Sequence, residues 1–235
     1  MSTNEPGAST VTPDTSPDAW SPGDGSPTDR LWLADWRRRV SALYAEVRGM
    51  TATEPEIAHA HWRAVRELLY LEHPQSPVPA AERASFEARY FAYDPALRFV
   101  VPIEAAPPPA PGALALALPN SGEDTLSFRR VGTVTLPLPG DPRRLSVFWM
   151  AGYAGGLFIP FRDGTNGTET YGAGRYLIDA AKSHDLGGDP ESGTLILDFN
   201  FATQPSCAFD PRWACPLAPP ENRLDLPIRA GERLA

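Results

Sequence analysis

The sequence predicts an α+β protein in which an N-terminal helical cap covers a mostly antiparallel β-sandwich or barrel. Up to about residue 72, apolar residues recur at spacings of three and four, which is typical of amphipathic helices. From about residue 97, short runs rich in β-branched and aromatic residues alternate with Gly, Pro, Asn and Asp, which favours antiparallel strands over βαβ units. The 27 prolines among 235 residues are about twice the usual frequency, so we expect short elements and many loops.

The first 27 residues are predicted to form a disordered tail. Five prolines are spread among Ser, Thr, Asp and Gly, and Val11 and Trp20 are the only sizeable apolar side chains. Such a segment buries too little apolar surface to offset the entropy of ordering it. We therefore expect one ordered domain, residues 28–235, with a helical cap over 28–92 and a β-rich body over 93–235.

The first helix is expected to begin near Thr28 or Asp29, because either side chain can cap a helix N-terminus. Gly49 is well suited to end it, because glycine is favoured just beyond a helix C-terminus. Its apolar positions are Leu33, Trp36, Val40, Leu43, Tyr44 and Val47.

A second helix is expected over about residues 53–72, with Pro55 in the first turn, where the missing amide proton is tolerated. Its predicted inner face carries Ile57, His61, Val65, Leu68 and Leu69. The prolines of segment 73–77 end it, because proline removes a donor and restricts the residue before it. A short third helix is predicted after Pro79, with Phe86 pointing inward.

The β-rich body is predicted to hold about eight strands. The strand-like runs are LRFVVPIE, ALALAL, TLSFRRVGTVTLPL, RLSVFWMAG, GLFIPF, TYGAGRYLIDA and TLILDFNFA. We expect hairpin or loop tips at Gly140-Asp141, Gly155-Gly156 and Gly187-Gly188. Pro102, Pro137 and Pro160 indicate sheet edges or bulges, because proline cannot donate to a strand ladder.

The charge of the chain restricts its partners. A formal net charge of −8 disfavours a nucleic-acid-binding surface. No apolar run reaches the roughly 18 residues of a membrane span, and the start of the sequence lacks the pattern of a secretory signal. We therefore expect a soluble cytoplasmic protein that binds neither nucleic acid nor membranes, and the sequence does not indicate its oligomeric state.

Histidine and cysteine spacing predicts no metal ligands. On a helix, His59 and His61 point in nearly opposite directions and cannot chelate one ion; only a strand at this position would let them do so. We expect His61 to pack inward and His59 to be solvated. Cys207 and Cys215 lack the short spacing and further ligands of zinc or redox motifs. Buried thiols and a disulfide both stay open, and a reducing compartment favours the thiols.

Polar side chains recur inside the apolar runs of residues 157–232. Burial without partners would cost each of them about 1 to 3 kcal/mol, so they need partners. With Thr165, which lies beside them in the chain, they form what we call the polar set: Asp163, Thr165, Tyr171, Arg175, Asp198, Asn200, Asn222, Arg223 and Glu232. Two interpretations stay open, because the set can pin Pro-rich loops onto the sheet or it can line a pocket.

The same stretch resembles a known family. The strings FIPFRDGT (158–165), GRYL (174–177), LDFN (197–200), ENRL (221–224) and AGE (230–232) are similar to those of the uncharacterised bacterial and archaeal family called domain of unknown function 1684. The segments HPQSP (73–77) and YDPALR (93–98) resemble a shorter, actinobacterial form of it, so the resemblance covers about residues 31–233. Phe201 and Thr203 depart from the Lys and Tyr that the family more often carries. The resemblance implies where a site lies and implies no reaction.

Our functional hypothesis is a small-molecule enzyme, of an acid/base or hydrolytic kind, or a ligand-binding protein. Arg175 and Arg223 would hold a small anionic ligand in bidentate fashion, with Thr165, Asn200, Asn222 and Glu232 as further ligand-binding residues. Asp163 or Asp198 would act as general base if burial raises its pKa, and Tyr171 would donate a hydroxyl proton.

Two alternatives remain. The polar set can be the bracing of a non-catalytic structural or interaction module. Asp163, Asp198 and Glu232 can instead be oxygen ligands of a hard cation in a metal-dependent enzyme. The sequence names no cofactor.

Overall fold

In a computed structural model of the chain, residues 25–107, 116–118, 127–151 and 155–234 are described. The predicted tail lies outside these residues except for its last three positions. No helix in the described part combines the length and apolarity needed to cross a membrane.

Helix α1 (Pro27–Met50) begins slightly earlier than predicted. Its N-cap is Ser26, whose side chain accepts a hydrogen bond from the amide of Asp29 at 3.1 Å. Pro27 then occupies the first helical position, where proline is favoured. The buried residues of α1 all lie in its second half: Val40, Leu43, Tyr44 and Val47.

Helix α2 (Pro55–Glu72) has the predicted extent but a different inner face. Its buried residues are Ala58, His59, Trp62, Arg66, Leu69 and Tyr70. Ile57 and Leu68, both expected inside, are more than half exposed. His59 is buried and His61 instead contacts Glu46 at the surface, so the expected orientation of the two histidines was wrong. The buried face of α2 is instead the one that carries Trp62 and Arg66, because Arg66 pairs with the buried Glu232.

The third predicted helix is a single 3-10 turn, η1 (Arg83–Ser85), and Phe86 behind it packs half-buried against Tyr70 and Phe209. Strand β1 (Arg89–Tyr90) follows and pairs with β11 (Glu232–Arg233) near the C-terminus. The other 3-10 turns are η2 (Pro95–Leu97), η3 (Ala180–Lys182), η4 (Phe199–Phe201), η5 (Ser206–Ala208) and η6 (Pro220–Asn222).

A six-stranded antiparallel sheet forms one layer, in the order β3-β5-β6-β7-β8 with β4 beside β5. Its strands are β3 (Glu104–Ala105), β4 (Leu116–Ala117), β5 (Ser127–Leu136), β6 (Arg143–Met150), β7 (Leu157–Phe161) and β8 (Arg175–Asp179). The predicted tips at Gly140-Asp141 and Gly155-Gly156 join β5 to β6 and β6 to β7. Pro160 lies at the expected bulge, where the register of β7 and β8 shifts.

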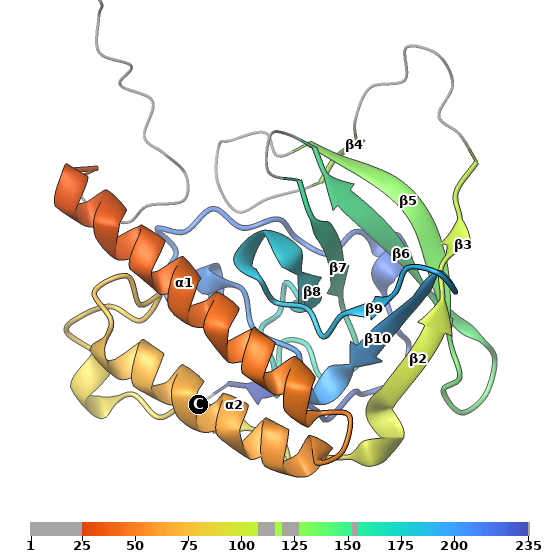
Figure 1. The fold of residues 1–235 in the computed structure, drawn as a ribbon, viewed down its shortest axis with the longest axis horizontal. Coiled ribbons are helices and arrows are strands. Elements are labelled where there is room, and N and C mark those ends of the chain that lie inside the picture. Colours follow the sequence, from red (N-terminus) through yellow and green to blue (C-terminus); the bar gives the residue numbers. More distant parts are fainter. Residues whose placement is uncertain (1–24, 108–115, 119–126, 152–154, 235) are drawn as a thin grey trace, which may run out of the picture.

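A three-stranded antiparallel sheet forms the second layer, with β10 (Thr194–Asp198) between β2 (Arg98–Pro102) and β9 (Gly188–Asp189). Neither sheet closes on itself, so the β-body is a sandwich and not a barrel. Figure 1 shows α1 and α2 side by side at one flank of the strands. The α+β class and the helical cap predicted from the sequence are confirmed.

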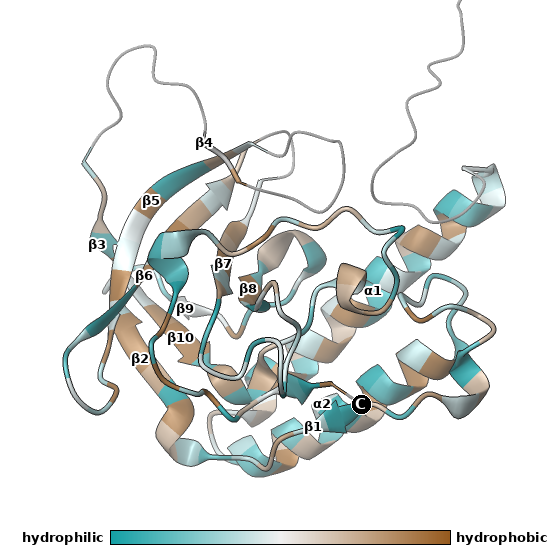
Figure 2. Ribbon diagram, turned by 180° about the vertical axis from the view of Figure 1, so that it is seen from behind, coloured by the Kyte–Doolittle hydropathy of each residue, from teal (hydrophilic) through white to brown (hydrophobic). Residues whose placement is uncertain are grey.

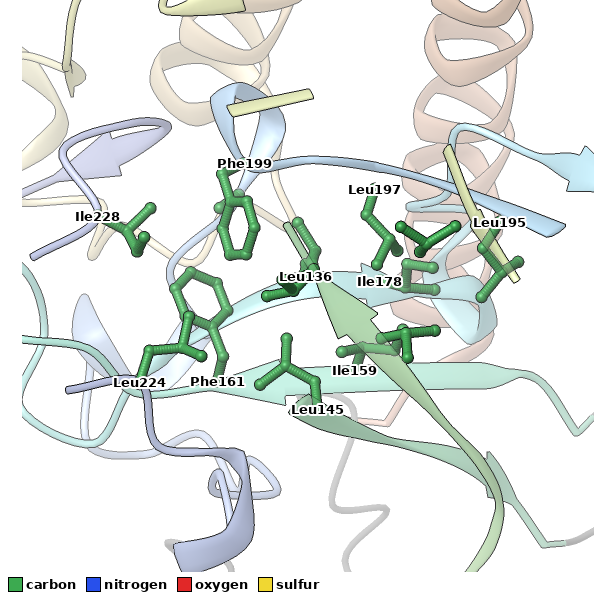
Figure 3. Close-up of a cluster of buried hydrophobic side chains, with 14 of the residues drawn as sticks. Leu136, Leu145, Ile159, Phe161, Ile178, Leu195, Leu197, Phe199, Leu224 and Ile228 are labelled. Atoms are coloured by element: carbon green, nitrogen blue, oxygen red, sulfur yellow. The ribbon is translucent and has the colours of Figure 1, made fainter. Parts of the chain in front are cut away.

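The main core lies between the two sheets. Figure 3 shows Leu136, Leu145, Ile159 and Phe161 of the larger sheet facing Leu195, Leu197 and Phe199 on and after β10. Within β10, Ile196 points the other way and packs against the helices with Phe201. Seen from behind, β2 and β10 are mainly hydrophobic in colour (Figure 2). β10 packs on both faces, whereas Val100 of β2 is exposed.

Candidate functional site

Arg175, the first residue of β8, is completely buried. Its Nη2 donates to Oδ2 of Asp163 at 2.6 Å and to the carbonyl oxygen of Ile228 at 2.7 Å. Its Nη1 donates to the carbonyl oxygens of Ala230 and Glu232. One guanidinium therefore ties the C-terminal segment to β8 and to the loop after β7.

The loop after β7 is organised around the second oxygen of Asp163. That oxygen accepts hydrogen bonds from the amide and the hydroxyl of Thr165, and Thr165 in turn contacts the hydroxyl of Thr170 at 2.8 Å. Gly174 has a φ of +108°, and a Cβ there would lie 2.5 Å from the carbonyl oxygen of Phe161. The backbone of β7 therefore lies closer to Gly174 than any side chain there would allow.

Glu232 forms a second buried centre with residues of α2. Its Oε1 accepts from Nε and Nη2 of Arg66 at 2.8 and 2.7 Å and from the hydroxyl of Tyr70 at 2.8 Å. Its Oε2 accepts from the amide of Gln204 at 2.6 Å. Burial raises the pKa of Tyr70 well above its ordinary value. This centre fastens α2 to the end of the β-body.

Asp198 and Asn200 form a third centre, at the end of β10. Asp198 accepts from the amide and side chain of Asn200 and pairs with Arg98 at 3.4 Å. Burial raises the pKa of Asp198, as a general base would require. The side chain of Asn200 also exchanges two hydrogen bonds of 2.8 Å with the backbone of Asp94, so the pair fixes the connection that leads into β2.

Asn222 and Arg223 are adjacent in sequence and have opposite environments. Asn222 is fully buried; it accepts from the amide of Ser146 and donates to the carbonyl oxygens of Ser146 and Pro160. Arg223 is exposed, and only its backbone is bridged, to that of Arg162.

Tyr171 lies half-buried against Cys207, Trp213 and Cys215, and burial raises its pKa to about 12. The two cysteines are buried and form no disulfide. The amide of Cys207 donates to Sγ of Cys215 at 3.3 Å. The hydrogen bond with the Cys207 thiol, together with burial, raises the pKa of the Cys215 thiol.

The structure therefore brings Asp163, Thr165 and Arg175 together, and Asp198 with Asn200, but does not gather the whole polar set. Each of the three carboxylates has an arginine of its own. No cluster of three or more His, Cys, Asp or Glu side chains in the described ranges is arranged to hold a metal. Of the set, Glu232 alone lines one of the three described cavities.

A cavity of about 250 Å³ lies between the helical cap and the β-body, on the inner side of α1. Its helical wall carries Leu33, Trp36, Arg37 and Val40 of α1 with Arg66 and Tyr70 of α2. The facing wall carries Gln75, Tyr176, Asp179, Lys182, His184, Thr203, Phe209, Trp213 and Cys215. Leu33 and Val40 are seven residues apart, so the α1 wall is about 10 Å long at 1.5 Å per residue.

The cavity is lined by more basic than acidic side chains. The basic ones are Arg37, Arg66 and Lys182, and the acidic one is Asp179. Lys182 pairs with Asp179 at 3.3 Å, and Arg66 pairs with Glu232 behind the wall. Arg38 and Arg39 both pair with Asp35, whereas the described residues give Arg37 no ion pair. The cavity therefore has one excess positive charge, at its α1 edge.

His184 and Gln75 supply polar atoms without partners. His184 is buried, and its Nδ1 lies 3.2 Å from the hydroxyl of Thr203. Its Nε2 has no hydrogen-bond partner among the described residues, and the same is true of Oε1 of Gln75. Burial, with the nearby charge of Arg66, lowers the pKa of His184 to about 3, so the imidazole is neutral near pH 7.

Sequence analysis missed this cavity. Arg66 was overlooked because the predicted inner face of α2 excluded it, although Arg66 and Tyr70 are four residues apart and so share a face. Arg37 and Lys182 look like ordinary surface charges, and no sequence signal separates them from their neighbours. Gln75 lies in segment 73–77, whose prolines indicate the end of a helix and give no sign of a cavity.

Residues 85–233 match the model of a family described as "Protein of unknown function (DUF1684)". A solution NMR structure of an uncharacterised protein from Haloarcula marismortui is 34% identical in sequence, with 73% of this chain and 90% of that chain covered and a TM-score of 0.53. A search of curated proteins gave no match.

Proposed function

Since the chain belongs to the family described as "Protein of unknown function (DUF1684)", whose description assigns no activity, we propose from the site alone that it binds a small organic anion in the cavity beneath α1. The observation that carries this proposal is the charge of the wall, where Arg37 adds a cation that no described carboxylate neutralises. A monoanion would balance it.

The shape and lining of the cavity suit an organic anion better than an inorganic one. Trp36, Val40, Phe209 and Trp213 contribute apolar surface beside the charged groups, and small-molecule sites usually combine such surface with a few polar groups. A cavity of 150 Å³ is known to hold benzene, so about 250 Å³ has room for roughly ten non-hydrogen atoms.

The polar set has a different role in this proposal. Four side chains of the set form hydrogen bonds with one another or with backbone groups: Asp163, Arg175, Asn200 and Asn222. These contacts support the bracing interpretation, in which the set holds the loops that form the far wall of the cavity. Glu232 connects the two parts, because it orients Arg66 in the cavity wall.

Benzoate, benzyl alcohol and benzylamine are suitable probes, because they share a ring and differ in charge. Binding can be followed by tryptophan fluorescence, since Trp36 and Trp213 line the cavity. We expect benzoate to bind most tightly and its affinity to fall with added salt. Equal affinity for all three probes would contradict the anion proposal.

Two arginines provide a matched pair of variants. Both arginines are exposed, but Arg37→Gln removes a cation that lines the cavity, whereas Arg38→Gln removes one that does not. We expect Arg37→Gln to weaken benzoate about threefold, as is usual for an exposed charge, and to leave benzyl alcohol unchanged. Leu33→Trp should block both probes by filling the cavity. Equal effects of the two arginine variants would count against the assigned position of the anion.

A further inference from the structure

We infer that Phe209 limits the length of the anion bound beneath α1, because its ring lies between that cavity and a second one. This inference rests on the proposed anion binding and adds a limit on the size of the ligand. The natural ligand is then a compact organic acid, whose apolar part is about the size of one aromatic ring and ends at Phe209.

The second cavity has a volume of about 200 Å³ and is lined by residues of the segment 78–90 and by the C-terminal residues 232–234. Three residues line both this cavity and the one beneath α1: Tyr70, Gln204 and Phe209. The two cavities are therefore adjacent and share a wall. Since 150 Å³ holds benzene, the two together would have room for roughly eighteen non-hydrogen atoms, against roughly ten for the first cavity alone.

Hydrogen bonds hold two of the three shared residues in place. The hydroxyl of Tyr70 donates to Oε1 of Glu232 at 2.8 Å. The side chain of Gln204 accepts from the amide of Tyr171 at 3.0 Å and donates to the carbonyl oxygen of Arg233 at 3.2 Å. Neither side chain can leave the shared wall without breaking these contacts.

The side chain of Phe209 is held by packing alone. It follows the 3-10 turn η5 and is half-buried. The centroid of its ring lies 5.1 Å from that of Tyr70 and 5.8 Å from that of Phe86. The ring has no donor or acceptor, so removing it leaves no buried polar group of that side chain's own making unpaired. Phe209 is therefore the part of the shared wall that a substitution can open.

An apolar chain that outgrows the first cavity has two courses in the natural protein. It displaces the ring of Phe209, which loses the contacts of that ring with Tyr70 and Phe86, or it extends into solvent, where its methylene groups stay hydrated and contribute no affinity. In both cases added length brings no tighter binding. Without the ring, the same chain would continue into the second cavity and bury its methylene groups there.

A series of four acids measures the length limit: benzoate, 3-phenylpropanoate, 5-phenylpentanoate and 7-phenylheptanoate. Each is two methylene groups longer than the one before, and burying two such groups tightens binding about tenfold. For the natural protein we expect the affinity to stop rising at 3-phenylpropanoate, because the first cavity is then full. For Phe209→Ala we expect it to keep rising, so that 7-phenylheptanoate binds the variant at least about tenfold more tightly than it binds the natural protein.

Three further variants assign the limit to Phe209. Phe209→Leu keeps part of the side chain in the wall, so its gain should be smaller than that of Phe209→Ala. Phe86→Ala is the matched control, because it removes the same ring from the second cavity alone and should leave the limit unchanged. Adding Ala88→Phe to Phe209→Ala should abolish the gain, because Ala88 lines only the second cavity and the larger side chain would fill it.

The possible results separate this inference from the anion proposal. If the affinity for Phe209→Ala and Phe209→Leu stops rising at the same acid as for the natural protein, the inference is wrong, and the binding of benzoate still supports the anion proposal. The inference also fails if Phe86→Ala gives an equal gain, or if the gain survives Ala88→Phe. If none of the four acids binds the natural protein or Phe209→Ala, both proposals are wrong.

Discussion

The guanidinium of Arg175 lies 2.6 Å from Oδ2 of Asp163, and both side chains are completely shielded from solvent. A buried pair of this kind holds structure in place when the other donors and acceptors around it are satisfied. Here three backbone carbonyl oxygens accept from Arg175 and two groups of Thr165 donate to Asp163, and of the pair only Nε of Arg175 has no hydrogen-bond partner among the described residues. The pair therefore joins strand β8, the loop after β7 and the C-terminal segment.

Arg175→Lys should lower the free energy of unfolding by about 3 to 5 kcal/mol, as expected for breaking a buried charge pair, because lysine cannot reproduce the planar fork of donors. The denaturant midpoint measures the loss. Arg223→Lys is the control, since Arg223 is exposed. A variant of unchanged stability that no longer binds benzoate would instead favour Arg175 as a ligand-binding residue.

Asn222→Ala should destabilise the protein by about 3 kcal/mol or more. The substitution leaves the amide and carbonyl of Ser146 and the carbonyl of Pro160 without a partner, and each unsatisfied buried group costs about 1 to 3 kcal/mol. Arg223→Ala at the next position should change stability by less than about 0.5 kcal/mol. Similar denaturation midpoints for the two variants would contradict the bracing role of Asn222.

The fold class was predictable from the sequence because periodicity and turn residues are local signals. The bulge at Pro160 and the hairpin at Gly140-Asp141 follow from the chemistry of single residues. The orientation of α2 was not predictable, because it depends on a partner of Arg66 that lies 166 residues away in the chain.

The candidate site was predicted less well for a related reason. Composition shows that Asp163, Arg175 and Asn222 must be satisfied when buried, but it does not show by what. Backbone carbonyl oxygens are present in every segment, so a side chain that binds them leaves no pattern in the sequence. The cavity wall combines residues of both helices with residues of β8 and of the segments after it, and only the packing of the helical cap on the β-body brings them together.

The protein should fold with Cys207 and Cys215 reduced and without stoichiometric zinc. The two cysteines are hydrogen-bonded to each other, and the raised pKa of Cys215 keeps the metal-binding thiolate form scarce. Elemental analysis and refolding in excess reducing agent test the two halves of this prediction. One zinc per chain, or failure to refold when reduced, would contradict it.

Removal of residues 1–24 should change the free energy of unfolding by less than about 0.5 kcal/mol. Ser26→Ala should cost about 1 kcal/mol, because it removes the side chain that caps α1 through the amide of Asp29. A truncation that also removes residues 25–27 should therefore behave like the cap variant. Melting temperatures compare the three proteins, and a loss of several degrees on removing residues 1–24 alone would show that this segment contributes to the fold.

Acidification should destabilise the protein through His59. This imidazole is buried among Trp62, Tyr93 and Phe201, and burial lowers its pKa from 6.5 to about 4. Between these two values the unfolded chain binds a proton that the folded chain does not bind. The free energy of unfolding therefore falls as the pH drops from 6.5 towards 4, at up to about 1.4 kcal/mol per pH unit for this group.

His59→Phe preserves an aromatic ring in the same surroundings and removes the titrating group. Its stability should consequently fall less steeply than that of the natural protein over the same pH range, so the difference between the two grows as the pH is lowered. His61→Phe is the control, because His61 lies at the surface beside Glu46. Denaturation midpoints at half-unit steps from pH 7 to pH 4 measure all three proteins. Parallel curves for His59→Phe and the natural protein would show that His59 can be protonated without unfolding.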